Sequence, residues 1–241
     1  MNVVWTLARR EWLSLLCTPL AYAVLAVFSL VSGLLFLANF GAGAPASLRG
    51  VAEGLIWLGA VLVPALAMRS LSEERHRGTL ERLMTMPLGE WQLVVGKWLA
   101  LMGLLALLGL PLLVQWSVLA VTATPAPSVG EAVAILTGLL LVGGLFASIG
   151  VAASAATENQ VVAWVVAVFL TGMLTFGLFV LADAEPVPPA LGEAARFANV
   201  NLRFQAAARG VLDARDAIFF LSTTATSLFV AVRVLESQRW R

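Results

Sequence analysis

The chain has few charges, one cysteine and one histidine, and these shortages exclude several classes of function. The single cysteine, Cys17, rules out a disulfide within the chain, and one histidine cannot supply a zinc site. Charged residues make up 12% of the sequence, whereas soluble domains contain about 25%. Because hydrophobic residues reach 60%, we expect the chain to lie in a lipid bilayer. A net charge of +1 gives no indication of nucleic-acid binding.

Familiar catalytic motifs are missing as well. The sequence has no G-x-x-x-x-G-K-[ST] phosphate-binding loop and no H-E-x-x-H zinc motif. Its apolar segments contain neither paired aspartates nor a base beside a serine, which argues against an intramembrane protease. They also lack the ionisable residues that ion-coupled carriers place inside the bundle. We therefore expect no enzyme, no resident metal or cofactor, and a conduit or lever that takes its energy from elsewhere.

What the chain does have is long apolar segments. A helix needs about 20 such residues to cross the hydrocarbon layer, and six segments reach or approach that length. They run from Leu20 to Phe40, Gly54 to Met68, Trp98 to Val121, Ala132 to Ala156, Val161 to Ala182 and Ala217 to Val232. The second and sixth are short and are expected to extend into their flanks. The sequence predicts an all-α membrane protein with one transmembrane domain, residues 1–241, and six membrane-spanning helices.

Lysine and arginine predict the orientation, because they gather on the cytoplasmic side of membrane proteins. With six spans both termini share one side, together with the polar segment 69–97, and this side carries most of the basic residues. Four of the five basic residues on the other side lie in the connection 183–216. We therefore predict cytoplasmic termini and a cytoplasmic segment 69–97.

Residues 1–18 have an amphipathic pattern. Trp5, Ala8 and Trp12 recur at helical spacing, with Arg9, Arg10 and Glu11 beside them. The pattern predicts a helix in the cytoplasmic interface, and the alternative is a frayed tail.

The polar segment 69–97 contains helix stop and start signals. Gly78 can end a charged continuation of the second span, and Thr79 can cap a short amphipathic helix that Pro87 ends. Such a helix, joined at both ends to membrane helices, is suited to transmit displacement. The alternative is that these charges only orient the chain.

Two further features remain. The external connection 183–216 opens with Pro186, Pro188 and Pro189 and then predicts one or two short helices. The spans also contain neutral polar residues that could line a path or a dimer interface, although hydrogen bonding between or within helices is the simpler explanation. The candidates are Thr171, Thr175, Ser222, Thr223 and Thr226.

The segment EERHRGTLERLMTMPLGEWQLVVGKWLA (Glu73 to Ala100) resembles the cytoplasmic coupling segment of ABC type-2 transporter permeases. The beginning, REWLSLLCTPLAYAVLAVFSLVSGLLF, and the end, FQAAARGVLDARDAIFFLSTTATSLFVAVRVLESQRW, are similar to the gliding-motility-associated, GldF-type permeases. The resemblance covers essentially the whole chain. It implies a six-helix permease of exporter-like type in the bacterial inner membrane, which pairs with a second copy of itself and binds two copies of a separate ABC ATPase.

The resemblance further implies that ATP and Mg²⁺ belong to the ATPase and that the helix near Thr79 to Met86 is the coupling helix. An auxiliary membrane protein with an extracytoplasmic domain is a further expected partner. The residues expected to contact the ATPase are Glu73, Glu74, Arg75, Arg77, Gly78, Thr79, Glu81, Leu83, Pro87 and Glu158. The alternative function is a mechanotransmitting scaffold subunit that moves no solute and acts on an extracytoplasmic partner through residues 183–216.

Overall fold

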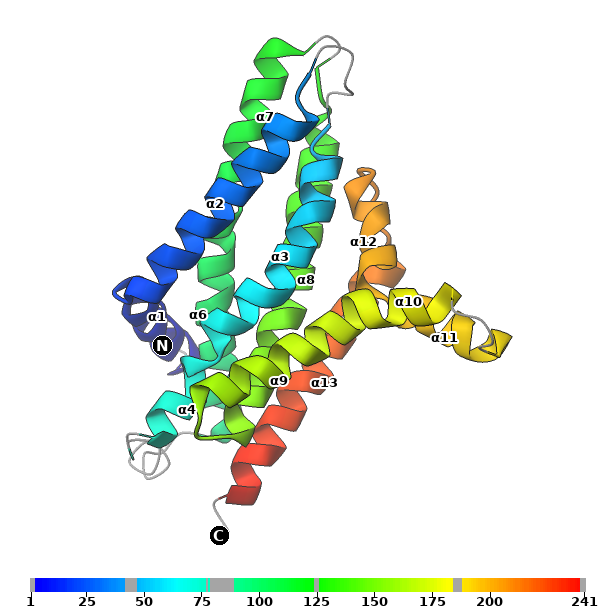
Figure 1. Ribbon diagram of the computed structural model, residues 1–241. Coiled ribbons are helices and arrows are strands. Elements are labelled where there is room, and N and C mark those ends of the chain that lie inside the picture. The colour runs from blue at the N-terminus through cyan, green and yellow to red at the C-terminus, as the bar shows by residue number, and fades with distance from the viewer. Residues whose placement is uncertain are drawn as a thin grey trace.

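The computed structural model describes residues 3–41, 47–76, 78, 89–123, 126–183 and 188–238, and its elements are helical. The helices are α1 (Val3–Leu16), α2 (Pro19–Asn39), α3 (Arg49–Ala67), α4 (Arg69–His76), α6 (Glu90–Leu108), α7 (Leu110–Thr122), α8 (Val129–Ala156), α9 (Gln160–Gly172), the π-helical turn η1 (Met173–Gly177), α10 (Leu178–Asp183), α11 (Pro189–Ala198), α12 (Val200–Ala208) and α13 (Ala214–Gln238). Figure 1 shows their arrangement.

Among the described residues, six helical segments are long and apolar enough to cross a membrane, which confirms the predicted fold class. They are Pro19–Asn39, Arg49–His76, Glu90–Thr122, Val129–Ala156, Gln160–Leu181 and Ala214–Ser237. The second and sixth extend into their flanks as expected. The helices α1 and α4 and the C-terminal end of α13 lie in the lower half of Figure 1, whereas the end of α2, the start of α3 and the end of α7 lie at the top.

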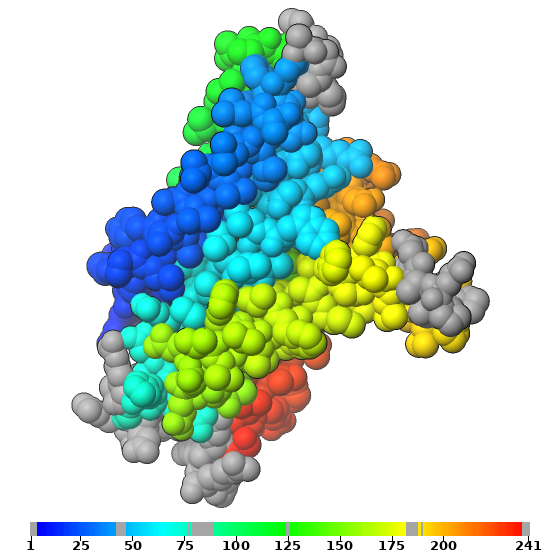
Figure 2. All heavy atoms as spheres, viewed as in Figure 1, coloured from blue at the N-terminus to red at the C-terminus, as the bar shows by residue number. Residues whose placement is uncertain are grey.

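Helix α8 is the centre of the bundle. It packs against α3, α6, α9, α12 and α13, and 67% of the residues in its most apolar stretch are buried, compared with 17% in the span that contains α9. Small residues allow this close packing: a Cβ atom on Gly150 would lie only 2.5 Å from the Cβ of Ala67 on α3. The space-filling view shows α2, α3 and α9 on the front face of the molecule, with α3 between the other two (Figure 2).

The third span differs from its prediction in two ways. It begins at Glu90 rather than near Trp98, so that Lys97 lies inside α6 instead of at the end of the polar segment. It is also broken at Gly109, where α6 ends and α7 begins with Pro111 in its first turn. Proline lacks a backbone N–H and cannot continue the hydrogen-bond ladder of a preceding helix, which accounts for the break.

Helix α1 forms as predicted over Val3–Leu16, and it packs along α6. A Cβ atom on Gly96 would meet Leu7 at 2.8 Å, and one on Gly103 would meet Trp12 at 2.9 Å. Two glycines one heptad apart therefore form the surface on which α1 rests. Its position in a membrane interface stays a prediction.

The predicted external connection contains the two helices α11 and α12. Their corner with α13 is held by Arg203, whose Nη1 lies 2.6 Å from Asp216 Oδ1 and whose Nε donates to the carbonyl of Phe197. The guanidinium also stacks on the rings of Phe197 and Phe219, each 4.2 Å from centroid to Cζ. This combination of an ion pair and cation–π contacts fixes the angle between the helices.

Candidate functional site

The lower end of the bundle brings α4, the start of α6, the α8–α9 turn and α1 together, and we take this charged cluster as the candidate site (Figure 1). Helix α4 continues α3 beyond Met68 and ends at His76. Gly78 follows with φ 65°, a left-handed conformation that glycine adopts without strain, and its N–H donates to the carbonyl of Arg75. The prediction that Gly78 ends this helix is therefore confirmed.

The α3–α4 junction is held by Ser154 of α8. Its hydroxyl oxygen accepts hydrogen bonds from the backbone N–H groups of Leu71 and Ser72, at 3.0 and 2.9 Å, and donates to the carbonyl of Met68 at 2.8 Å. Ser154 is fully buried. One side chain thus satisfies backbone groups that the break between α3 and α4 leaves open, and it ties the base of α4 to the central helix.

A second weak point in α3 lies one turn earlier, at Pro64. Because proline has no N–H, the carbonyl of Ala60 loses its partner within the helix. Thr171 of α9 donates to this carbonyl at 2.7 Å. This bond joins α3 to α9 and gives Thr171, a predicted path residue, a defined contact within the chain.

Lys97 is the buried charge of the site. Only 3% of its side chain is exposed, and its Nζ lies 2.7 Å from Glu74 Oε1 on α4 and 3.3 Å from Glu11 Oε2 on α1. A buried ammonium group is stable only when it is paired and hydrogen-bonded. The three residues therefore form one unit, which we call the Lys97 cluster, and it joins α1, α4 and α6.

A second ion pair connects the end of α4 to the α8–α9 turn. Arg75 Nε lies 3.0 Å from Glu158 Oε1, and the two side chains are 28% and 62% exposed. The turn itself is tight because Asn159 caps α9 by accepting from the N–H groups of Val161 and Val162. A hollow of about 460 Å³ lies beside the pair, lined by His76, Glu158, Asn159 and Gln160.

The predicted ATPase-contact residues are partly brought together here. Glu73, Glu74 and Arg75 lie on α4, and Glu158 reaches Arg75 from the α8–α9 turn. Glu74 faces Lys97, so its carboxylate has a structural partner in the chain. The predicted helix near Thr79 to Met86 lies outside the described residues, as do Arg77, Thr79, Glu81, Leu83 and Pro87.

The predicted path residues fall into two groups. Thr171 and Thr175 are buried, and the side-chain amide of Asn199 donates to the carbonyl of Thr175 at 3.0 Å. The hydroxyls of Ser222, Thr223 and Thr226 on α13 donate to carbonyls of their own helix, three or four residues earlier, as the hydroxyl of Thr175 also does. Ser222 and Thr226 are exposed on the surface of this chain.

Sequence reasoning missed three residues of the site: Glu11, Lys97 and Ser154. Lys97 carried a signal, because a lone cation beside a long apolar segment requires a partner if its helix is buried. The partners could not be identified, since Glu11 and Glu74 lie 86 and 23 residues away in the chain. Ser154 carried no signal that separates it from other small residues in α8.

Comparison with known proteins agrees with this architecture. The family described as ABC-2 family transporter protein matches residues 43–198. The chain is also similar to the probable ABC transporter permease protein NosY of Pseudomonas aeruginosa, with 34% identity over 108 residues. That alignment covers 41% of this chain and 38% of the relative's length. The family match covers more than half of the sequence and includes four of the candidate membrane spans and the parts of the charged cluster on α4, α6 and the α8–α9 turn, whereas α1 with Glu11 lies outside it. The chain belongs to the ABC-2 family of transporter proteins.

Proposed function

We propose that this protein is the membrane-spanning permease subunit of an ATP-driven, exporter-like ABC transporter. In this proposal a separate ATPase subunit binds and hydrolyses ATP with Mg²⁺, and the permease converts its movement into movement of the spans. The observation that carries the proposal is the charged cluster at one end of the bundle. Its exposed members face outward, while its buried members are tied to the core by Ser154 and Lys97.

The contacts suggest how force would travel. A push on the end of α4 reaches α9 through Arg75 and Glu158, reaches α8 through Ser154, and reaches α6 and α1 through the Lys97 cluster. Helices are rigid over these lengths, so displacement concentrates at the breaks. The α3–α4 junction at Met68 and the α6–α7 break at Gly109 are two such points along these routes.

The assembly that we propose contains two copies of this chain and two ATPase subunits in the bacterial inner membrane, with both termini cytoplasmic. The exposed hydroxyls of Ser222 and Thr226 on α13 would then face the second copy or the transport path, and Thr171 and Thr175 would hold α9 in place beside them. The similarity of both ends of the sequence to gliding-motility-associated permeases supports that subgroup, and with it an auxiliary extracytoplasmic protein.

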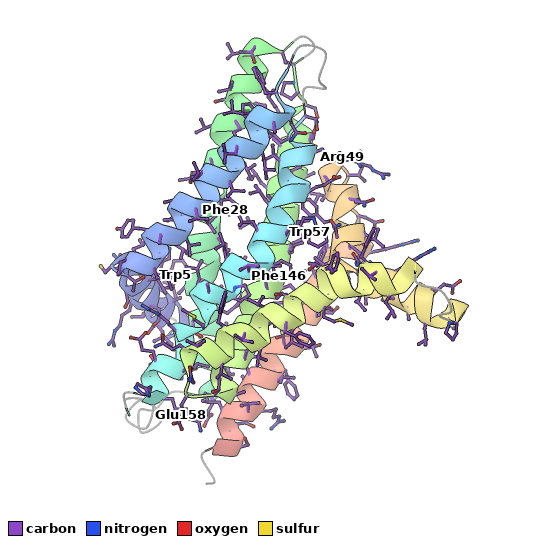
Figure 3. All side chains as sticks on the ribbon, in the orientation of Figure 1. Trp5, Phe28, Arg49, Trp57, Phe146 and Glu158 are labelled. Carbon is purple, nitrogen blue, oxygen red and sulfur yellow. The ribbon has the colours of Figure 1, made fainter. Side chains whose placement is uncertain are left out.

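Co-purification of charge variants tests the ATPase contact. Arg75→Glu and Glu158→Arg each place like charges together, and we expect each to lower the amount of ATPase recovered with the tagged chain. The matched control is the pair Arg49 and Glu53, which lie 2.8 Å apart on α3 at the opposite end of the bundle (Figure 3). Glu53→Arg should leave recovery unchanged. Full recovery with both site variants would refute the proposed contact surface.

A mechanotransmitting scaffold is the second candidate, and one observation favours it. Helices α11 and α12 form a fixed external corner that still exposes large apolar side chains, Leu191 at 58% and Phe197 at 66%. Such a surface suits an extracytoplasmic protein. Vesicles that contain the complete complex discriminate the two functions. ATP-dependent accumulation of a solute in the vesicles supports the transporter. Absence of transport, together with loss of an extracytoplasmic partner from the Leu191→Glu variant, supports the scaffold.

A further inference from the structure

A cavity of about 180 Å³ lies inside the bundle, away from the charged cluster. It is enclosed by α2, α3, α6, α7 and α8 and lies beside the break at Gly109. The residues that line it in the described part of the chain are all apolar. The permease function proposed above assigns no role to this space.

The cavity has a closed inner end and an open mouth. The inner end is formed by Phe28, Ile56 and Phe146, whose exposed fractions are 7%, 1% and 1%. Figure 3 labels Phe28 on α2 and Phe146 on α8. The mouth lies between α6–α7 and α8, where Ala106 and Leu113 line the cavity and are exposed at the protein surface.

Glycine keeps this space open. A Cβ atom on Gly59, which lines the inner wall, would lie 3.9 Å from the nearest atom, a ring carbon of Phe146. That separation is an ordinary contact, so the position has room for a side chain that the sequence does not provide. Gly109 and Gly143 line the same cavity without side chains.

The chemistry of the walls determines what can enter. Water needs polar partners inside a cavity, and an engineered cavity of about 150 Å³ lined by Leu, Ile and Phe stays dry and binds benzene. All five enclosing helices belong to candidate membrane spans, so the medium at the mouth is the hydrocarbon layer of the bilayer. A flexible alkyl chain is the apolar group that this medium supplies at high concentration.

We propose that the cavity binds an acyl chain of a membrane phospholipid, which enters from the bilayer between α6–α7 and α8. The chain end reaches the inner wall at Phe146, and the headgroup stays outside the cavity. The residues that line the site all belong to one chain.

Photochemical labelling tests this site. The tagged full-length chain is reconstituted in phosphatidylcholine vesicles that contain a phospholipid with a diazirine near the end of one acyl chain, and the sites of attachment are mapped after illumination. We expect labels at Phe28, Ile56 or Phe146 in addition to Phe169 on α9, which is 70% exposed and serves as the internal standard.

Filling the cavity supplies the decisive comparison. Gly59→Leu should lower labelling of the inner wall by about tenfold relative to Phe169, because the leucine occupies the volume of the chain end. Gly33→Leu is the matched control, since Gly33 lies on α2 with nothing within 4 Å of its Cβ position. If Gly59→Leu does not fold by gel filtration, Gly59→Ala replaces it and a partial decrease is expected.

Two results would overturn the proposal. The first is labelling of Phe169 with none at the inner wall, which would mean an empty cavity. The second is inner-wall labelling that Gly59→Leu and Gly59→Ala leave unchanged, which would mean that the probe reaches these residues by another route.

Discussion

Replacement of Lys97 by methionine is expected to destabilise the bundle far more than the loss of the more distant carboxylate partner, Glu11. At an effective dielectric constant of about 20, the charges of Lys97 and Glu74 at 2.7 Å attract each other by about 6 kcal/mol, and those of Lys97 and Glu11 at 3.3 Å by about 5 kcal/mol. The cost of removing all three charged groups from water offsets most of this attraction. Loss of Lys97 alone leaves both carboxylates removed from water, but abolishes their attraction to the ammonium group. Removal of one partner from a buried ion pair destabilises proteins by about 3–5 kcal/mol.

Two further variants of the Lys97 cluster provide stabilities with which Lys97→Met can be compared. Glu11→Gln keeps the shorter ion pair and an acceptor oxygen, so its cost should be about 1 kcal/mol. The triple variant Lys97→Met, Glu11→Gln and Glu74→Gln removes every charge of the cluster and should recover most of the lost stability, because neutral groups replace a complete buried ion set at little net cost. Reversible unfolding in mixed micelles, followed by tryptophan fluorescence, measures these free energies. The reasoning fails if Lys97→Met is as mild as Glu11→Gln or if the triple variant is as unstable as the single one.

Two further substitutions test the α3–α4 junction and the packing of α1 against α6. Ser154→Ala removes the acceptor of two backbone N–H groups and should cost about 1–3 kcal/mol, with faster amide exchange at Leu71 and Ser72; unchanged exchange there would contradict the role of Ser154. Gly96→Val would force a Cβ atom to within 2.8 Å of Leu7 and should cost about 1–3 kcal/mol in the same unfolding assay. The control Gly33→Val meets nothing within 4 Å and should be nearly neutral, so equal stabilities of the two valine variants would refute the packing argument.

The apolar segments were sufficient to predict the six spans, because the requirement for about 20 apolar residues is strict in a bilayer. Local signals also predicted the end of α4 at Gly78 and the short helices of the 183–216 connection, since both depend on neighbouring residues. The resemblance of Glu73 to Ala100 predicted the family that the comparison then showed.

Apart from the break at Gly109, for which Pro111 is a local signal, the parts that escaped prediction depend on contacts between distant segments. The Lys97 cluster requires α1, α4 and α6 to meet, and the hydrogen bond from Thr171 to the carbonyl of Ala60 requires α3 to lie beside α9. Lys97 was expected to end the polar segment 69–97, but it lies inside a helix. A charge that has ion-pair partners can be buried in a helix bundle, whereas a charge without partners cannot. A hydropathy value is assigned to each residue by itself, so it contains no information about such partners.

The most direct test of the central claim uses a photo-crosslinking amino acid at position 158, in the exposed α8–α9 turn, in cells that express the whole complex. The account predicts a nucleotide-dependent crosslink to an ABC ATPase, identified by mass spectrometry, and no ATPase crosslink from position 53 at the opposite end of the bundle. Equal crosslinking of an ATPase from both positions, or none from position 158 while the complex is intact, would contradict the proposal that this charged cluster receives the force of ATP binding.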